Sequence, residues 1–220
     1  MMPLKFEVFY DPIAHIVIDN FFSEEEQDRA FVLIEYLENH MNYGKVLKKH
    51  DAEEKINEVN LADKKVKNIW PYDLVEDNDD SLAKEFCQLI EKKMWSDQML
   101  NIYAECNDSL FQFYHMVNSS HILVSKYEKG DFYKWHHDIG MSITGNIWLS
   151  KDNVEGGDFI LHKPNKISNP NEEKKTIKYK SNTCILFPGR CDHMVSEVLN
   201  DSKRFSIQYF SQILDKYKEG

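Results

Sequence analysis

Three polar residues in the second half of the chain have the types and the spacing of ligands for one metal ion. His136 and Asp138 lie two positions apart. Because alternate residues of a β-strand point to the same side, these two side chains can converge on one ion while His137 faces away. His193 follows the apolar run that begins at Cys184 and is the candidate third ligand. Two imidazoles and one carboxylate form the facial set of non-haem iron(II), which leaves further coordination positions open.

A histidine two positions before an aspartate is a weak signal by itself, because such triplets occur by chance. Several separate features accompany the triplet in this chain. A predicted strand and the double-glycine turn at 156–157 follow the pair, and the Pro-Gly turn at 188–189 comes shortly before His193. Arg204, a basic residue, then begins another predicted strand. Their agreement supports the metal site better than the triplet alone does.

The elements that must position these residues are predicted to be short strands. From Phe111 onward, runs rich in β-branched and aromatic residues alternate with Gly- and Pro-containing turns. Many short strands at this spacing are typical of a β-sandwich or jelly roll. The predicted strands are 111–117, 121–127, 142–150, 157–162, 175–180, 183–189 and 205–210.

The first half of the chain is predicted to be mostly helical. After a strand at 15–22, Ser23 can cap a helix that extends to about Asn39, and Glu26 stands where a capping box needs an acid. A second helix is predicted to begin after Ser81 and to end near Leu100. We therefore expect helices first and a β-rich half after them.

Composition limits the classes of protein that the chain can belong to. Hydrophobic residues make up 42% and charged residues 29%, as in ordinary globular proteins. The formal net charge of −10 argues against a non-specific nucleic-acid binder, which needs a basic surface. The N-terminus lacks the pattern of a secretory signal, and no apolar run is long enough to span a membrane. A cytoplasmic location with reduced cysteines is therefore expected.

A lysine-rich stretch at 163–180 is the one feature that favours nucleic acid. We interpret it as a solvated loop, since charge runs usually are. Asp192, which precedes His193, could support the metal ligands from behind, but we prefer to interpret it as a turn acid.

Taken together, these motifs resemble the 2-oxoglutarate and iron(II)-dependent oxygenases, and the prolyl-4-hydroxylase-like branch above all. The resemblance covers residues 121–211 well and residues 15–39 loosely. It implies a single domain over residues 1–220 that is mainly β with N-terminal helices. A double-stranded β-helix (jelly roll) core at 111–220 would be flanked by a helical support region at 1–110. The pattern that carries the resemblance is Tyr127 … Gly130 … His136-x-Asp138 … Gly156-Gly157 … Phe187-Pro188 … His193-x-Val195 … Val198 … Arg204-x-Ser206.

The resemblance also implies roles for individual residues. His136, Asp138 and His193 would bind iron, and Arg204 would pair with the distal carboxylate of 2-oxoglutarate, as guanidinium groups do with carboxylates. Lys203 is the competitor for that role. On a strand the two basic side chains point to opposite faces. The residues that follow, FSIQYF at 205–210, match the family's pattern better if Arg204 is the residue that holds the carboxylate.

Tyr127 stands where relatives often place a tyrosine hydroxyl near the cosubstrate, and a half-buried strand tyrosine is the equal alternative. The chain departs from the pattern on the strand 144–149. Relatives often offer a tyrosine there, whereas this chain has Trp148 at the matching position. Asn146 or Thr144, on the same side, could supply the hydrogen bond instead.

The activity implied by the resemblance is hydroxylation that consumes O₂ and 2-oxoglutarate, with ascorbate in support. The branch favours a peptidyl proline or another protein side chain as the substrate. The alternatives are a small molecule or a nucleic-acid base. A different class is a non-catalytic jelly roll that binds a ligand or partner, although such a module needs neither a complete triad nor Arg204.

Overall fold

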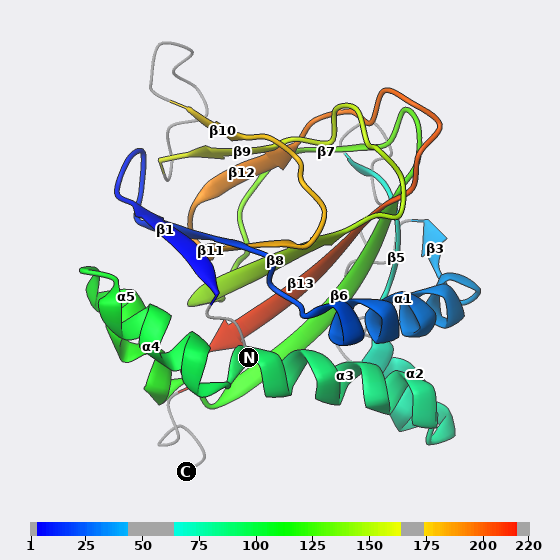
Figure 1. Ribbon diagram of the computed structural model, residues 1–220, viewed down its shortest axis with the longest axis horizontal. Helices are drawn as coiled ribbons and strands as arrows, with labels where there is room; N and C mark the ends of the chain where they lie inside the picture. Colours follow the sequence, from blue (N-terminus) through cyan, green and yellow to red (C-terminus); the bar gives the residue numbers. More distant parts are fainter. Residues whose placement is uncertain (1–3, 44–63, 164–173, 215–220) are drawn as a thin grey trace.

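The protein is arranged in three layers (Figure 1). The computed structural model describes residues 4–43, 64–163 and 174–214. Helices cover the outer face of an eight-stranded sheet, and a five-stranded sheet lies over the inner face. Two antiparallel sheets stacked in this way form the predicted jelly roll, so the expected fold class is confirmed.

The large sheet combines both halves of the chain. Strands from the N-terminal third join it at each edge, and the central strands come from the β-rich half. Its helix-facing side is apolar, because Ile147, Leu186 and Ile207 alternate there with inward-facing residues. Its strand order is β1 (Lys5–Phe9), β2 (His15–Asp19), β11 (Thr183–Pro188), β8 (Ile143–Leu149), β13 (Arg204–Gln212), β6 (Ser119–Tyr127), β5 (Lys67–Ile69) and β3 (Asn42–Tyr43).

The small sheet provides the other wall of the jelly roll. Its central strand β12 pairs with β9 on one side and with β7 on the other. Its strand order is β10 (Lys175–Ile177), β9 (Phe159–His162), β12 (Asp192–Val195), β7 (Phe132–His136) and β4 (Lys64–Lys65).

One short segment passes from one sheet to the other and closes a side of the jelly roll. β4 pairs with β7 of the small sheet, and β5, two residues later, pairs with β6 of the large sheet. Val66, between them, is buried in the cluster that fills the space between the sheets. This crossing brings the side chain of Lys64 into the interior.

The helices form one layer against the large sheet. Met94 contacts β8 so closely that a Cβ at Gly145 would lie 3.0 Å from its methyl group. Among the described residues, no helix is both long enough and apolar enough to cross a membrane. The helices are α1 (Glu24–Glu38), α2 (Pro71–Asn78), α3 (Ser81–Met94), α4 (Asp97–Glu105), α5 (Ser109–Gln112) and the 3₁₀ turn η2 (Phe113–Met116).

The start of α1 has the predicted capping box. The Ser23 hydroxyl accepts a hydrogen bond from the backbone N–H of Glu26, whose carboxylate accepts one from the N–H of Ser23. The same carboxylate pairs with Lys93 of α3 at 2.8 Å. The cap therefore also joins two helices of the outer layer.

Two predicted elements, one in each half of the chain, are wrong in detail. The helix predicted from 81 to about 100 is two helices, because α3 ends before Trp95. Ser96 is the N-cap of α4, and its hydroxyl accepts a hydrogen bond from the backbone N–H of Met99. The run 111–117, predicted as a strand, is helical, and Phe111 and Tyr114 are buried three positions apart. That spacing matches a helical turn, which aromatic composition alone does not reveal.

Candidate metal centre

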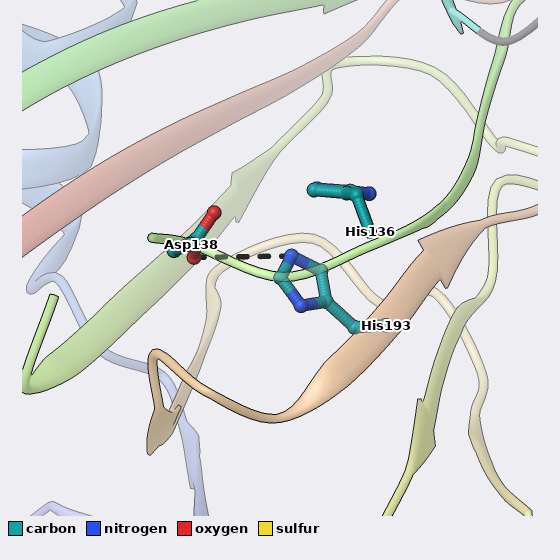
Figure 2. A group of neighbouring side chains, drawn as sticks. All are labelled: His136, Asp138 and His193. Carbon is teal, nitrogen blue, oxygen red and sulfur yellow. Dashed lines mark ion pairs between the residues drawn. The ribbon is translucent and has the colours of Figure 1, made fainter. Parts of the chain in front are cut away.

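His136, Asp138 and His193 converge in one pocket (Figure 2). His136 ends β7, Asp138 follows it in the adjoining loop, and His193 lies on β12 directly opposite His136 in the strand pairing. One ligand atom from each residue lies within 4.8 Å of the other two. His193 Nε2 is 3.8 Å from Asp138 Oδ2.

Both imidazoles are oriented by backbone carbonyl groups. His136 Nδ1 lies 2.8 Å from the carbonyl oxygen of Lys134, and His193 Nδ1 lies 2.9 Å from that of Cys191. These contacts place the hydrogen on Nδ1 and leave each Nε2 with a lone pair, which is how a metal-binding histidine is usually held. Burial, together with the neighbouring His193, lowers the pKa of His136 well below its usual value. The neutral form that binds a metal is therefore favoured.

The Asp138 carboxylate is held by a loop that meets the Pro-Gly turn. The backbone N–H of Asp138 donates to the carbonyl of Gly189 at 2.8 Å, and the Thr144 hydroxyl donates to Oδ2 of Asp138 at 2.7 Å. A Cβ at position 189 would lie 2.5 Å from the carbonyl oxygen of Met141. Glycine is thus required where the two loops touch.

His137 and Asp192 form a contact beside the triad. His137 points away from the site, as strand alternation predicts, and its Nδ1 lies 3.4 Å from Asp192 Oδ1. Asp192 is a buried residue of β12, with 2% exposure, so its interpretation as a turn acid is wrong. Asp192 is buried because β12 lies between β7 and β9. The sequence showed only that Asp192 follows a Pro-Gly turn, which does not indicate such a central strand.

Arg204, the first residue of β13, is fully buried. The guanidinium carbon lies 4.8 Å from the ring centre of Tyr127, 5.4 Å from that of Trp148 and 5.2 Å from that of Tyr179. None of its three nitrogens has a hydrogen-bond partner in the described part of the chain. Burial lowers the pKa of Arg204, yet a guanidinium stays charged in proteins. Buried guanidinium nitrogens without a hydrogen-bond partner of their own are suited to an anionic ligand.

The second glycine of the double-glycine turn makes room for this arginine. Gly157 has φ of +63°, and a Cβ there would lie 2.8 Å from Arg204 Cδ. Lys203, the competitor, points outward, with a side chain 51% exposed, and pairs with Glu38 at 2.7 Å. The geometry supports Arg204 for the carboxylate.

The remaining predicted site residues line the pocket that contains the triad. Tyr127 is buried, and burial raises the pKa of its phenol to about 12 although Arg204 acts to lower it. Asn146 Oδ1 accepts a hydrogen bond from the Ser206 hydroxyl at 2.5 Å, and Thr144 is engaged by Asp138. Direct contact of these residues with a cosubstrate stays a prediction.

Sequence reasoning missed Lys64 and Tyr179. Lys64 lines the same pocket, and burial lowers its pKa to about 8 while Asp138 acts to raise it. Tyr179 completes the aromatic cage around Arg204, and its hydroxyl has no partner among the described residues. The sequence around Lys64 has no helical or strand periodicity. Tyr179 lies in the lysine-rich stretch, whose charge predicts a solvated loop.

Part of the lysine-rich stretch lies outside the described residues, namely 164–173. The lysines beyond it contact the protein itself. Lys178 pairs with Asp158 at 2.7 Å, Lys180 pairs with Asp19 at 2.9 Å, and Lys174 lies over the Trp135 ring. Such contacts support the interpretation that the stretch is not a nucleic-acid surface, which stays a prediction.

Residues 122–212 match the family model of the 2OG-Fe(II) oxygenase superfamily. The matched part extends from β6 to β13 and includes the triad and Arg204. The resemblance to this oxygenase superfamily is confirmed. Over 142 residues the chain is 22% identical to a PKHD-type hydroxylase of Parvibaculum lavamentivorans, an alignment that covers 60% of this chain and 56% of that protein. The chain thus spans little more than half the length of this curated relative.

Solved structures with a similar fold include two prolyl hydroxylases. A Pseudomonas putida prolyl-4-hydroxylase superposes with a TM-score of 0.59 at 10% identity, over 90% of this chain and 92% of that chain. A Trichoplax adhaerens prolyl hydroxylase, solved with a peptide fragment of hypoxia inducible factor, gives 0.58 at 17% identity, over 89% and 83%. At these identities the likeness shows that the oxygenase fold is shared.

The donor set fits the iron(II) and 2-oxoglutarate that this superfamily is named for. Two free Nε2 atoms and one carboxylate converge as a facial set for iron(II). The unpartnered guanidinium of Arg204 is suited to one end of a dicarboxylate.

Proposed function

We propose that the protein is a 2-oxoglutarate- and O₂-dependent hydroxylase that uses one iron(II) and acts on a protein side chain such as proline. The observation that carries this proposal is the convergence of His136, Asp138 and His193 with both Nε2 atoms free. A binding module has no need for such a set together with a buried, unpartnered arginine.

Iron(II) held by these three side chains would supply the site at which O₂ is reduced as 2-oxoglutarate is decarboxylated to succinate. The residues of the chain have separate tasks around it. Thr144 and the carbonyl of Cys191 keep Asp138 and His193 in one orientation. Phe159 and Phe187 line the pocket with apolar surface, which limits the access of water.

Arg204 would fix the far end of the cosubstrate. Its cage of Tyr127, Trp148 and Tyr179 holds the guanidinium in one place without neutralising it. Because a bidentate ion pair defines both position and orientation, the cosubstrate would reach the triad in one pose.

The proposed substrate class has weaker support than the chemistry. The curated relative is a hydroxylase by name, and the structures that share the fold include prolyl hydroxylases, one of them with a peptide. A peptide is therefore the first substrate to test.

The test is succinate formation by the purified protein with iron(II), ascorbate, O₂ and 2-oxoglutarate. We expect turnover that requires iron and is lost in His136→Ala. His115→Ala is the matched control, because His115 is exposed and outside the pocket. Turnover that persists in His136→Ala, or iron binding without any turnover in the presence of candidate substrates, would argue for a different function.

Proline-containing peptides then test the substrate class. We expect them to stimulate succinate formation and to gain one oxygen atom, as measured by mass spectrometry, while peptides with alanine in place of proline do neither. Equal stimulation by both peptides would exclude proline. Stimulation only by a small molecule or a nucleobase would exclude a protein substrate.

A further inference from the structure

Lys64 differs from the other lysines around the crossing between the two sheets. Lys65 pairs with Asp131 at 3.2 Å, and Lys67 pairs with Glu128 at 3.0 Å. Lys126, only 5% exposed, contacts the carboxylates of both Glu38 and Glu128. Lys64 is equally buried, at 5% exposure, yet no carboxylate of the described residues lies within ion-pair distance of it.

The side chain of Lys64 is directed into the pocket of the triad. The pocket is lined by Lys64 together with His136, Asp138 and His193. Its Nζ lies 4.4 Å from the ring centre of Tyr133, and that ring stacks on His136 with centroids 3.5 Å apart. The ammonium group is thus one aromatic ring away from a proposed iron ligand.

A buried ammonium without a counter-ion is unfavourable by several kcal/mol unless something compensates it. The Tyr133 ring compensates only part of this cost, since a cation–π contact does not neutralise the charge. The charge of Asp138 also acts on the ammonium, but no ion-pair contact joins the two groups, and the carboxylate is directed at the metal site and at Thr144. The Lys64 ammonium, which lines the triad pocket, is therefore suited to an anionic ligand there.

We propose that Lys64 binds a carboxylate inside the triad pocket and so acts as a second recognition cation beside Arg204. This inference rests on the proposed function, because it concerns the ligands of the same pocket. Arg204, on β13, is caged by aromatic rings, whereas Lys64, on β4, lines the pocket beside His136. The two cations thus stand on different elements, which suits two different carboxylate groups.

The carboxylate can come from two sources with the same chemistry. It can be the metal-side carboxylate of 2-oxoglutarate, or an acid group on the molecule that is hydroxylated. If the carboxylate belongs to 2-oxoglutarate, saturation with 2-oxoglutarate occupies Lys64. If it belongs to the second substrate, Lys64 can still bind another anion after saturation.

The variants are Lys64→Met, Lys64→Arg and, as a matched control on the same strand, Lys65→Met. The first measurement is binding of 2-oxoglutarate to the anaerobic iron(II) protein, followed by calorimetry and by the visible charge-transfer band of the chelate. The second is fluorine NMR of trifluoroacetate with zinc-loaded protein saturated with 2-oxoglutarate.

If the carboxylate belongs to the cosubstrate, Lys64→Met weakens 2-oxoglutarate binding by about tenfold or more, the usual effect of losing one charge-assisted hydrogen bond. If it belongs to the second substrate, 2-oxoglutarate binding is unchanged, and trifluoroacetate binds to the wild type but not to Lys64→Met. In either case Lys64→Arg retains binding and Lys65→Met behaves as the wild type. The proposal is overturned if Lys64→Met changes neither measurement.

Thermal unfolding distinguishes a ligand-binding role of Lys64 from a purely structural one. Removing a buried charge that has no partner should leave the melting temperature of Lys64→Met equal or higher. Lys126→Met, which leaves Glu38 and Glu128 without their buried partner, should melt lower. An equal loss in both variants would show that Lys64 has a structural partner and would contradict the proposal.

Failure of the proposed function is distinguishable from failure of this inference. A wild-type protein that binds no 2-oxoglutarate sinks the oxygenase proposal. Trifluoroacetate binding that depends on Lys64 in the metal-free protein would still support the carboxylate site.

Discussion

On the face of the eight-stranded sheet that meets the helices, Ile147, Leu186 and Ile207 pack into one apolar cluster. On the face that meets the small sheet, Arg204 and Trp148 are as deeply buried but have polar nitrogens without partners among the described residues. The same strands supply both faces, because successive side chains alternate. Burial on the helix side is almost purely apolar, whereas the inner side buries polar groups among its apolar residues.

The largest difference between the two faces should be seen by removing a proposed metal ligand. Asp138→Ala should lower turnover roughly a thousandfold or more, since a bound metal lowers the barrier by several kcal/mol. Its melting temperature should change by only a few degrees, because Asp138 is not part of the apolar cluster. Succinate formation and thermal unfolding measured on the same sample check both statements. Collapse of the fold would contradict the separation of the two faces.

The opposite effect is expected on the helix-facing side. Ile207→Ala should lower the free energy of unfolding by about 2–5 kcal/mol, because it leaves a cavity in the fully buried cluster. Denaturant unfolding measures this loss, and turnover per folded molecule should stay near that of the wild type. Leu199→Ala, at a residue that is 59% exposed, is the control and should change stability little.

Arg204→Met should have the opposite effect to Ile207→Ala, with binding weakened and stability retained. We expect 2-oxoglutarate to bind about a hundredfold more weakly, since two charge-assisted hydrogen bonds are lost. Stability should be retained, because a buried charge without a partner is replaced by an apolar side chain. Calorimetric titration beside Lys203→Met distinguishes the two basic residues. Weaker binding in the Lys203 variant alone would assign the carboxylate to Lys203.

The smallest effect is expected at Thr144. Thr144→Val removes the hydroxyl that orients Asp138 and should weaken iron binding about tenfold, as loss of a hydrogen bond to a metal ligand does. Thr144→Ser should restore it. An anaerobic iron titration measures the effect, and unchanged affinity in the valine variant would show that Asp138 needs no such support.

The sequence predicted what depends on local patterns. The capping box at Ser23 and the strand character of β13 follow from spacing along a single element, and His136 and Asp138 do converge, although Asp138 lies in the loop after β7 and not on the predicted strand. The turns at 156–157 and 188–189 were also recognised, although their close contacts with Arg204 and the Asp138 loop appear only in three dimensions.

What could not be predicted depends on pairing between distant strands. Lys64 belongs to a two-residue strand whose place is decided by its partner β7. No periodicity can be read from so short an element. Asp192 is buried because of the strands on either side of it, and Tyr179 because it closes over Arg204. The run 111–117 shows that aromatic residues also build helical turns.

The position of β13 has a consequence for the order of folding. This last strand inserts between β6 and β8, which have no pairing with each other, so the centre of the large sheet stays open until β13 is in place. Contacts across such a sequence separation close slowly because of the loop entropy involved. During synthesis, the unpaired edges of β6 and β8 would be exposed to other chains until residue 212 has emerged. Since Arg204 begins this strand, the proposed cosubstrate site and the completed sheet form in the same step, and a ligand on Arg204 would stabilise the folded state by mass action.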